Sequence, residues 1–126
     1  MKVDISQFHD AFFEEMSEHL AAMEQLLVGL NIENPDAESL NGIFRAAHSI
    51  KGGAGIFGFP DLASFTHVLE SLLDQLRSEK LALQPAMIDS FLAARDVLER
   101  MQSRYRRGGE ADDDEKNDTA IISAQL

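Results

Sequence analysis

The sequence predicts an all-α fold, an up-down antiparallel four-helix bundle. Whether a short fifth helix follows at the carboxyl end is left open. Three observations lead to this prediction. Apolar residues recur at three- and four-residue steps along four segments, which is the spacing of one helix face. A capping residue or a proline stands at the start of each segment. The connections are short, so neighbouring helices should be antiparallel.

The first segment begins with a capping signal. Asp4 and Gln7 have the spacing of a capping box, and Val3 and Phe8 have the spacing of the hydrophobic staple that accompanies such a box. A long apolar stripe follows. We expect its core residues to be Ile5, Phe8, Phe12, Met16, Leu20, Met23, Leu27 and Leu30, and we expect Phe13 either to join this core or to be exposed beside a partner surface.

The other three segments are bounded by proline and glycine. The second begins at Asn34–Pro35 and ends near Gly58, the third begins at Pro60, and the fourth begins at Pro85. Basic residues precede Gly108–Gly109, as the carboxyl end of a helix prefers. In the second segment the expected core residues are Leu40, Ile43, Phe44, Ala47, Ile50, Ala54 and Phe57.

Composition changes after the fourth segment. Residues 110–118 contain six acids and one lysine, which predicts a solvated linker. Ile121, Ile122 and Leu126 could form a short helix that docks on the bundle, although so short a segment would not be stable alone. We therefore expect a bundle domain over residues 1–107 and an acidic tail over residues 108–126, in a chain cut from a longer protein.

Size and charge restrict the function. The 126 residues allow one domain, and the absence of cysteine excludes disulfides and cysteine-based zinc sites. A net charge of −11 argues against nucleic acid or anionic lipid as the partner. No segment approaches the ~20 apolar residues that cross a bilayer. We expect a monomeric cytoplasmic domain whose partners are proteins.

One turn of the second segment has the features of a phosphoryl-accepting surface. His48 lies about 120° from the mean direction of the apolar residues, so it should face outward. Lys51 follows at i+3 and Gly52 at i+4, which places a cation and open backbone beside the imidazole. Gly52 and Gly53 each cost about 1 kcal/mol in a helix interior. Close approach by another molecule would explain this cost, and tight helix packing is the alternative.

Glu70 is the predicted partner of His48. In an antiparallel hairpin the two residues are level, because each is eleven positions from Phe59. Both point into the shared seam or both away from it. If they point into it, the carboxylate accepts from Nδ1–H and leaves Nε2 free as a nucleophile. His67, three residues before Glu70, could extend the network, and Lys51 would supply charge for phosphoryl oxygens.

These residues resemble a known family. The run from His48 to Ala54 is similar to the phosphoacceptor motif of histidine-containing phosphotransfer (HPt) domains, most of all those at the amino-terminal end of CheA-type chemotaxis histidine kinases. The likeness covers about residues 3–105, and it includes these segments: Asp4–Phe8, Phe12–Glu15, Glu18–Leu20, Arg45–His48, Phe57–Phe59 and Thr66–His67 followed by Glu70.

The resemblance implies a function. A separate ATP-binding kinase domain, of the same or a partner subunit, would phosphorylate His48 at Nε2 with ATP and Mg²⁺. The phosphoryl group would then pass to an aspartate of a CheY- or CheB-type response regulator that holds its own Mg²⁺. Glu70 would bind the His48 ring, with Lys51 and His67 in the surrounding network.

Three other functions remain open at this point. A di-metal bundle is disfavoured because His67-x-x-Glu70 reverses the usual Glu-x-x-His order. A passive helical adaptor would leave the surroundings of His48 unexplained. A free-standing HPt relay would be fed by a receiver domain. The chain alone is not expected to be an enzyme or to bind ATP, because it lacks a Gly-x-x-x-x-Gly-Lys-Ser/Thr loop.

Overall fold

A computed structural model describes residues 5–108 and 113–126 of the chain. Within these ranges the chain forms helices joined by short connections and no β-strand. The predicted all-α fold is confirmed. The helices are α1 (Ile5–Val28), α2 (Ala37–Phe57), α3 (Pro60–Arg77), α4 (Pro85–Arg107) and α5 (Asp113–Gln125).

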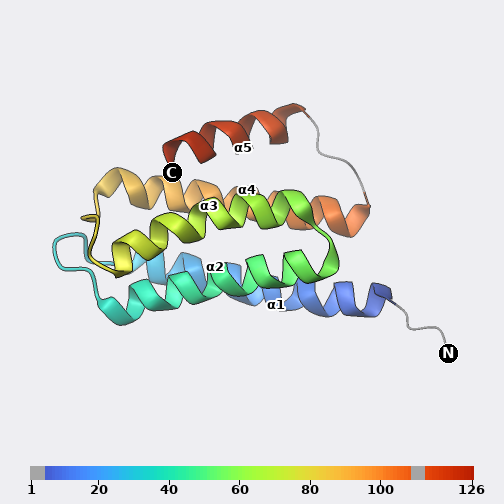
Figure 1. The fold of residues 1–126 in the computed structure, drawn as a ribbon, viewed down its shortest axis with the longest axis horizontal. Coiled ribbons are helices and arrows are strands. Elements are labelled where there is room, and N and C mark those ends of the chain that lie inside the picture. Colours follow the sequence, from blue (N-terminus) through green and yellow to red (C-terminus); the bar gives the residue numbers. More distant parts are fainter. Residues whose placement is uncertain (1–4, 109–112) are drawn as a thin grey trace.

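The first four helices form the bundle, as Figure 1 shows. α1 packs against α2 and α4, α2 packs against α3, and α3 packs against α4, so the four helices close around one core. Each follows the last through a short connection, which makes neighbours antiparallel. The α2–α3 pair has the most extensive contact, and the seam between these two helices carries the site described below.

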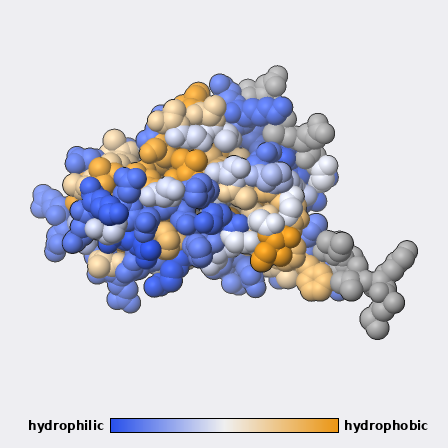
Figure 2. All heavy atoms as spheres, viewed as in Figure 1, coloured by the Kyte–Doolittle hydropathy of each residue, from blue (hydrophilic) through white to orange (hydrophobic). Residues whose placement is uncertain are grey.

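The core is built from the apolar stripes of the four helices. Most of the predicted inward positions are fully buried, and hydrophilic residues cover much of the outer face in Figure 2. Side chains with essentially no exposed surface include Met16, Met23, Ile43, Ala47, Ile50, Leu62, Leu69, Ala94 and Leu98.

The prediction that Phe8 belongs to the core is wrong, because 51% of this residue is exposed. It lies in the first turn of α1, and that end of the helix extends beyond the connection between α2 and α3 (Figure 1). The apolar stripe therefore continues one turn past the helices that could cover it. The capping box that begins at Asp4 lies partly outside the described residues.

The helix boundaries follow the predicted punctuation. Asp36 caps α2 by accepting from the backbone N–H of Ser39 at 3.2 Å, so the helix begins just after the expected Asn34–Pro35. Pro60 and Pro85 each open a helix. Gly58 ends α2 with a left-handed backbone, φ 79°, which turns the chain directly into α3.

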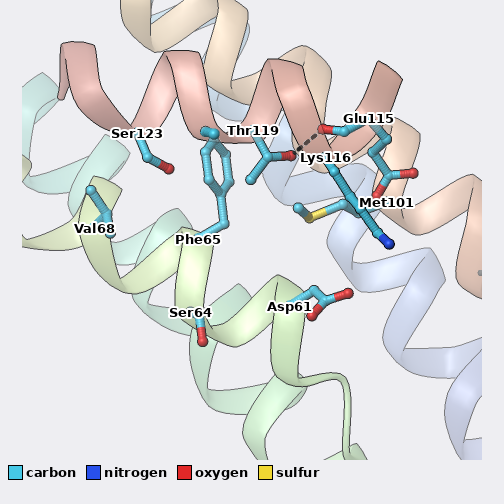
Figure 3. Close-up of a pocket in the computed structure, with 10 residues that line it drawn as sticks. Asp61, Ser64, Phe65, Val68, Met101, Glu115, Lys116, Thr119 and Ser123 are labelled. Atoms are coloured by element: carbon cyan, nitrogen blue, oxygen red, sulfur yellow. Dashed lines mark hydrogen bonds between the residues drawn. The ribbon is translucent and has the colours of Figure 1, made fainter. Parts of the chain in front are cut away.

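The carboxyl-terminal residues form the short docked helix that the sequence left open, and this helix begins inside the run that is predicted to be a solvated linker. α5 packs on α4 and α3, and Glu115, inside the acidic run, is buried. Its carboxylate accepts from Arg104 Nε at 2.9 and 3.1 Å, which fixes the first turn of α5 to α4. Figure 3 shows Phe65 of α3 pointing toward α5, across a cavity of about 380 Å³. This part of the acidic run forms a docked helix because Glu115 finds a buried partner in Arg104 and because α5 packs on α3 and α4.

Candidate functional site

His48 lies on the outer edge of α2, and 61% of its side chain is exposed. The sequence places it there because Ala47 and Ile50, its neighbours in the apolar stripe, are fully buried against the other helices. A residue between two such positions is turned toward the border of the buried face. The imidazole is thus held on a rigid helix and is accessible to another molecule.

Glu70 reaches His48 across the α2–α3 seam. The distance from His48 Nδ1 to Glu70 Oε2 is 3.2 Å, and only 14% of the glutamate side chain is exposed. The two residues are level in the antiparallel hairpin, and of the two orientations left open by the sequence the structure has the one that points both into the seam. The short connection at Phe59 sets this register, because it fixes which turns of α2 and α3 face each other.

Lys51 binds the same carboxylate. Its Nζ lies 2.9 Å from the Glu70 carboxylate oxygens, and 28% of the lysine side chain is exposed. One turn of α2 therefore presents both partners of Glu70, His48 and Lys51, at i and i+3. The ammonium stands beside the imidazole, where it can attract an incoming anionic group.

The charge state of Glu70 determines the proton positions. Burial by itself would raise the pKa of this carboxyl, but the hydrogen bonds and charges of Lys51 and His48 outweigh burial and lower the pKa below its ordinary value of 4.5. Glu70 is therefore an ionised acceptor at neutral pH. The neutral His48 ring must then carry its proton on Nδ1, which leaves the lone pair on the exposed Nε2.

His67 is not brought into this network. It lies on α3 one turn before Glu70 and is exposed. Within the part of the chain that the structure describes, its side chain makes no hydrogen bond or ion pair. Its backbone carbonyl accepts from Ser71 Oγ at 3.0 Å. The predicted extension of the network through His67 is therefore absent, because the carboxylate of Glu70 is already engaged by Lys51 and His48.

We expect His67→Gln to leave the reactivity of His48 within about twofold of the wild type, because removal of an exposed side chain without partners typically has small effects. The rate of His48 phosphorylation by a fixed donor measures this. If His67→Gln slowed phosphorylation as much as Glu70→Ala does, His67 would be part of the functional site and this prediction would be contradicted.

The two predicted surface glycines have different surroundings. A Cβ at Gly52 would meet no atom within 4 Å, so this position is open surface one turn from His48. A Cβ at Gly53 would collide with the ring of Phe12, which is buried. Gly52 thus has the open surface that close approach needs, whereas Gly53 has the tight helix packing that the sequence left as the alternative, because its missing side chain lets α1 pack closely on α2.

This difference predicts opposite stability effects. Gly52→Ala should raise the free energy of unfolding by up to about 1 kcal/mol through helix propensity alone. Gly53→Ala should lower the free energy of unfolding by about 1 kcal/mol. Overpacking against Phe12 costs about 1–3 kcal/mol, which exceeds the gain in helix propensity. Urea unfolding of both variants measures the difference. Equal values for the two would contradict the packing role of Gly53.

Sequence reasoning missed one neighbour of the imidazole. The apolar pattern predicts that Phe44 lies in the core, but the residue is half-buried and its ring lies nearly parallel to that of His48. The signal was present in the sequence, since Phe44 precedes His48 by four residues and such pairs meet on a helix. The described residues contain no cluster of three metal-ligating side chains, and none of their helices is long and apolar enough to span a membrane.

Comparisons with known proteins show the family to which the chain belongs. The Hpt domain family matches residues 7–115. The chain is 49% identical over 112 residues to the chemotaxis protein CheA of Salmonella typhimurium, covering 89% of this chain and 17% of that protein. It is 36% identical over 124 residues to the chemotaxis protein CheA of Bacillus subtilis, covering 98% of this chain and 18% of that protein. The chain thus spans less than a fifth of the length of these curated relatives.

Two solved structures are similar in fold. The CheA phosphotransferase domain from Thermotoga maritima superposes with a TM-score of 0.74 at 31% identity, over 82% of this chain and 98% of that one. The phosphorylated P1 domain of CheA3 from R. sphaeroides, solved in complex with CheY6, superposes with a TM-score of 0.81 at 19% identity, over 94% of each chain. By its sequence match and by its similarity to a phosphotransferase domain, the chain belongs to the Hpt domain family.

Proposed function

We propose that this chain is the phosphoacceptor domain of a CheA-type histidine kinase that acts in chemotaxis signalling. His48 takes a phosphoryl group from ATP bound to a separate kinase domain and passes it to an aspartate of a CheY- or CheB-type response regulator. The observation that carries the proposal is the contact of His48 Nδ1 with the ionised, largely buried carboxylate of Glu70, which leaves Nε2 exposed.

The first transfer uses the Nε2 lone pair of His48. A bond forms between Nε2 and the γ-phosphorus of ATP, the bond from that phosphorus to the β–γ bridging oxygen breaks, and ADP leaves. The ring becomes positively charged when Nε2 is phosphorylated. Glu70 stabilises this charge because the Nδ1 proton remains in its hydrogen bond to the carboxylate. Lys51 places a positive charge where the phosphoryl oxygens arrive.

The second transfer reverses the roles of the imidazole. An aspartate oxygen of the regulator attacks the phosphorus, the Nε2–P bond breaks, and the neutral ring regains its Nε2 lone pair. The open surface at Gly52 supports close approach by both protein partners, since no side chain stands there. ATP and Mg²⁺ would be held by the kinase domain, and a second Mg²⁺ by the regulator, so this chain acts as a carrier in the cytoplasm.

A reconstituted transfer assay tests the proposal. The chain is mixed with ATP, Mg²⁺ and a CheA kinase fragment that lacks its own phosphotransfer domain, and a CheY-type receiver is added afterwards. We expect acid-labile, alkali-stable label on the chain that then moves to the receiver. An active fragment that leaves the chain unlabelled would contradict the proposal, and label taken instead from a phosphorylated receiver would favour a free-standing relay.

A further inference from the structure

An aromatic residue and a cation lie next to the acceptor histidine. The ring centroids of Phe44 and His48 are 5.9 Å apart, and the ring planes differ by 13°. The guanidinium carbon of Arg77, from the last turn of α3, lies 3.7 Å from the centroid of the Phe44 ring. Asp74 Oδ1 accepts from Arg77 Nε at 2.8 Å. The α2–α3 seam thus continues from His48 into a stack of rings and a guanidinium.

The bond to Glu70 does not by itself fix the acceptor ring. A single hydrogen bond at Nδ1 leaves the imidazole able to pivot about the line from Nδ1 to the carboxylate oxygen. The terminal torsion of histidine is broad, and core packing cannot restrict it because 61% of the His48 side chain is exposed. A second contact, on the face of the ring, is needed to set its plane. Phe44 provides a nearly parallel ring at a separation typical of offset stacking.

We propose that Phe44, held in place by Arg77, is a positioning residue for phosphoryl acceptance by His48. Phe44 sets the plane of the imidazole, so that the Nε2 lone pair points out of the seam in one fixed direction. This inference rests on the proposed function and adds a residue to its site. Phe44 acts through His48 and does not contact the phosphoryl group. Transfer rates depend on such alignment, because reacting atoms must meet in a near-attack geometry.

Arg77 is suited to hold the Phe44 ring. Its planar guanidinium can lie flat on an aromatic face, and its bond to Asp74 limits where that plane can go. If Phe44 and Arg77 served packing alone, their replacement would change stability and leave the reactivity of a folded His48 unchanged. The test must therefore measure reactivity and ring orientation in folded variants.

The experiment compares two replacements of Phe44 with two phosphoryl donors. Phe44→Leu keeps apolar bulk and removes the ring, whereas Phe44→Tyr keeps the ring. The donors are the ATP-loaded kinase fragment and phosphoramidate, whose P–N bond breaks as Nε2 bonds to phosphorus and ammonia leaves. We expect Phe44→Leu to lower the rate with both donors by about fivefold, with an unchanged KM for the kinase pair, and Phe44→Tyr to stay within about twofold of the wild type.

A rate that falls only with the kinase would place Phe44 in a docking surface and overturn the inference. The His48 ring-proton shifts of the folded proteins give a second readout, because a parallel ring shields its neighbour. Those shifts should change in Phe44→Leu and persist in Phe44→Tyr, and unchanged shifts in Phe44→Leu would also overturn it. Thermal unfolding verifies folding, and Phe44→Met is a second ring-free variant if Phe44→Leu folds poorly.

Arg77→Gln tests the second member of the pair. Like Phe44→Leu, Arg77→Gln should lower the rate with phosphoramidate, here by about twofold, and it should broaden the NMR signals of the His48 ring. The reason is that a Phe44 ring without the guanidinium on its face holds the imidazole less firmly. If Arg77→Gln had the rates and ring signals of the wild type, the proposed role of Arg77 in holding Phe44 would be contradicted. A wild-type chain that takes no label from either donor would overturn the proposed function, whereas a labelled wild type with an equally labelled Phe44→Leu would overturn this inference alone.

Discussion

His48→Gln is expected to abolish phosphorylation of the chain, with no label above background from the kinase fragment. The glutamine amide nitrogen has no available lone pair, so it cannot form the bond to phosphorus that the imidazole forms. His48 is exposed, so the replacement should leave the bundle folded. Labelling followed by acid and alkali treatment measures the effect.

The exposed histidine on the neighbouring helix provides the matched control for this loss. His67→Gln changes the same residue type at an exposed position of α3 and should remain labelled. If His48→Gln kept some label and the added His67→Gln substitution removed that label, His67 would be an acceptor and the assignment to His48 would be contradicted.

Glu70→Ala is expected to slow phosphorylation of His48 by about 10- to 100-fold, the range for a misaligned reacting group. The variant removes the acceptor at 3.2 Å from Nδ1, so both tautomers become populated and the positive charge of the phosphorylated ring loses its partner. Single-turnover labelling at saturating kinase measures this rate. Wild-type kinetics in a folded Glu70→Ala protein would reject the orienting role.

Glu70→Gln separates orientation from charge. The amide oxygen can still accept from Nδ1–H, but it carries no charge to stabilise the phosphorylated ring or to bind Lys51. Its rate should therefore lie between those of the wild type and Glu70→Ala. Lys51→Ala should lose less than Glu70→Ala, because 28% of the lysine side chain is exposed and its charge is partly screened. A larger loss would reverse this ranking.

Acid pH should weaken the same contact. The pKa of Glu70 is lower in the folded protein than its ordinary value of 4.5, so the folded state binds the Glu70 proton less readily than the unfolded state. The stability that Glu70 contributes is therefore fully present above pH 4.5 and is lost as the pH falls through the lowered pKa. Glu70→Gln should lack this part of the acid sensitivity.

Much of the fold could be predicted from local sequence signals. Proline and glycine at Gly58, Pro60 and Pro85 fixed the helix boundaries, and the short connection at Phe59 set which turns of α2 and α3 are level. That register brought Glu70 to His48, so the central contact of the site followed from counting residues. Whether the two side chains face into the seam required the actual rotation of each helix.

Other features depended on contacts between distant residues. The difference between Gly52 and Gly53 arises because Phe12, from α1, covers one of them and leaves the other open. The docking of α5 depends on Arg104, which is buried and donates hydrogen bonds to the carboxylate of Glu115. The local sequence predicts a solvated acidic run over residues 110–118 and leaves open whether residues 119–126 form a docked helix. Such pairings are not encoded in the periodicity of either segment.

The tautomer of His48 tests the central claim most directly, and nitrogen NMR of ¹⁵N-histidine-labelled protein measures it before and after phosphorylation. We expect the neutral ring to carry its proton on Nδ1, the nitrogen beside Glu70, and the phosphorus coupling to appear at Nε2. In Glu70→Ala the proton should distribute over both nitrogens. A neutral wild-type ring protonated at Nε2, or phosphorus coupled to Nδ1, would contradict the role that the geometry gives to Glu70.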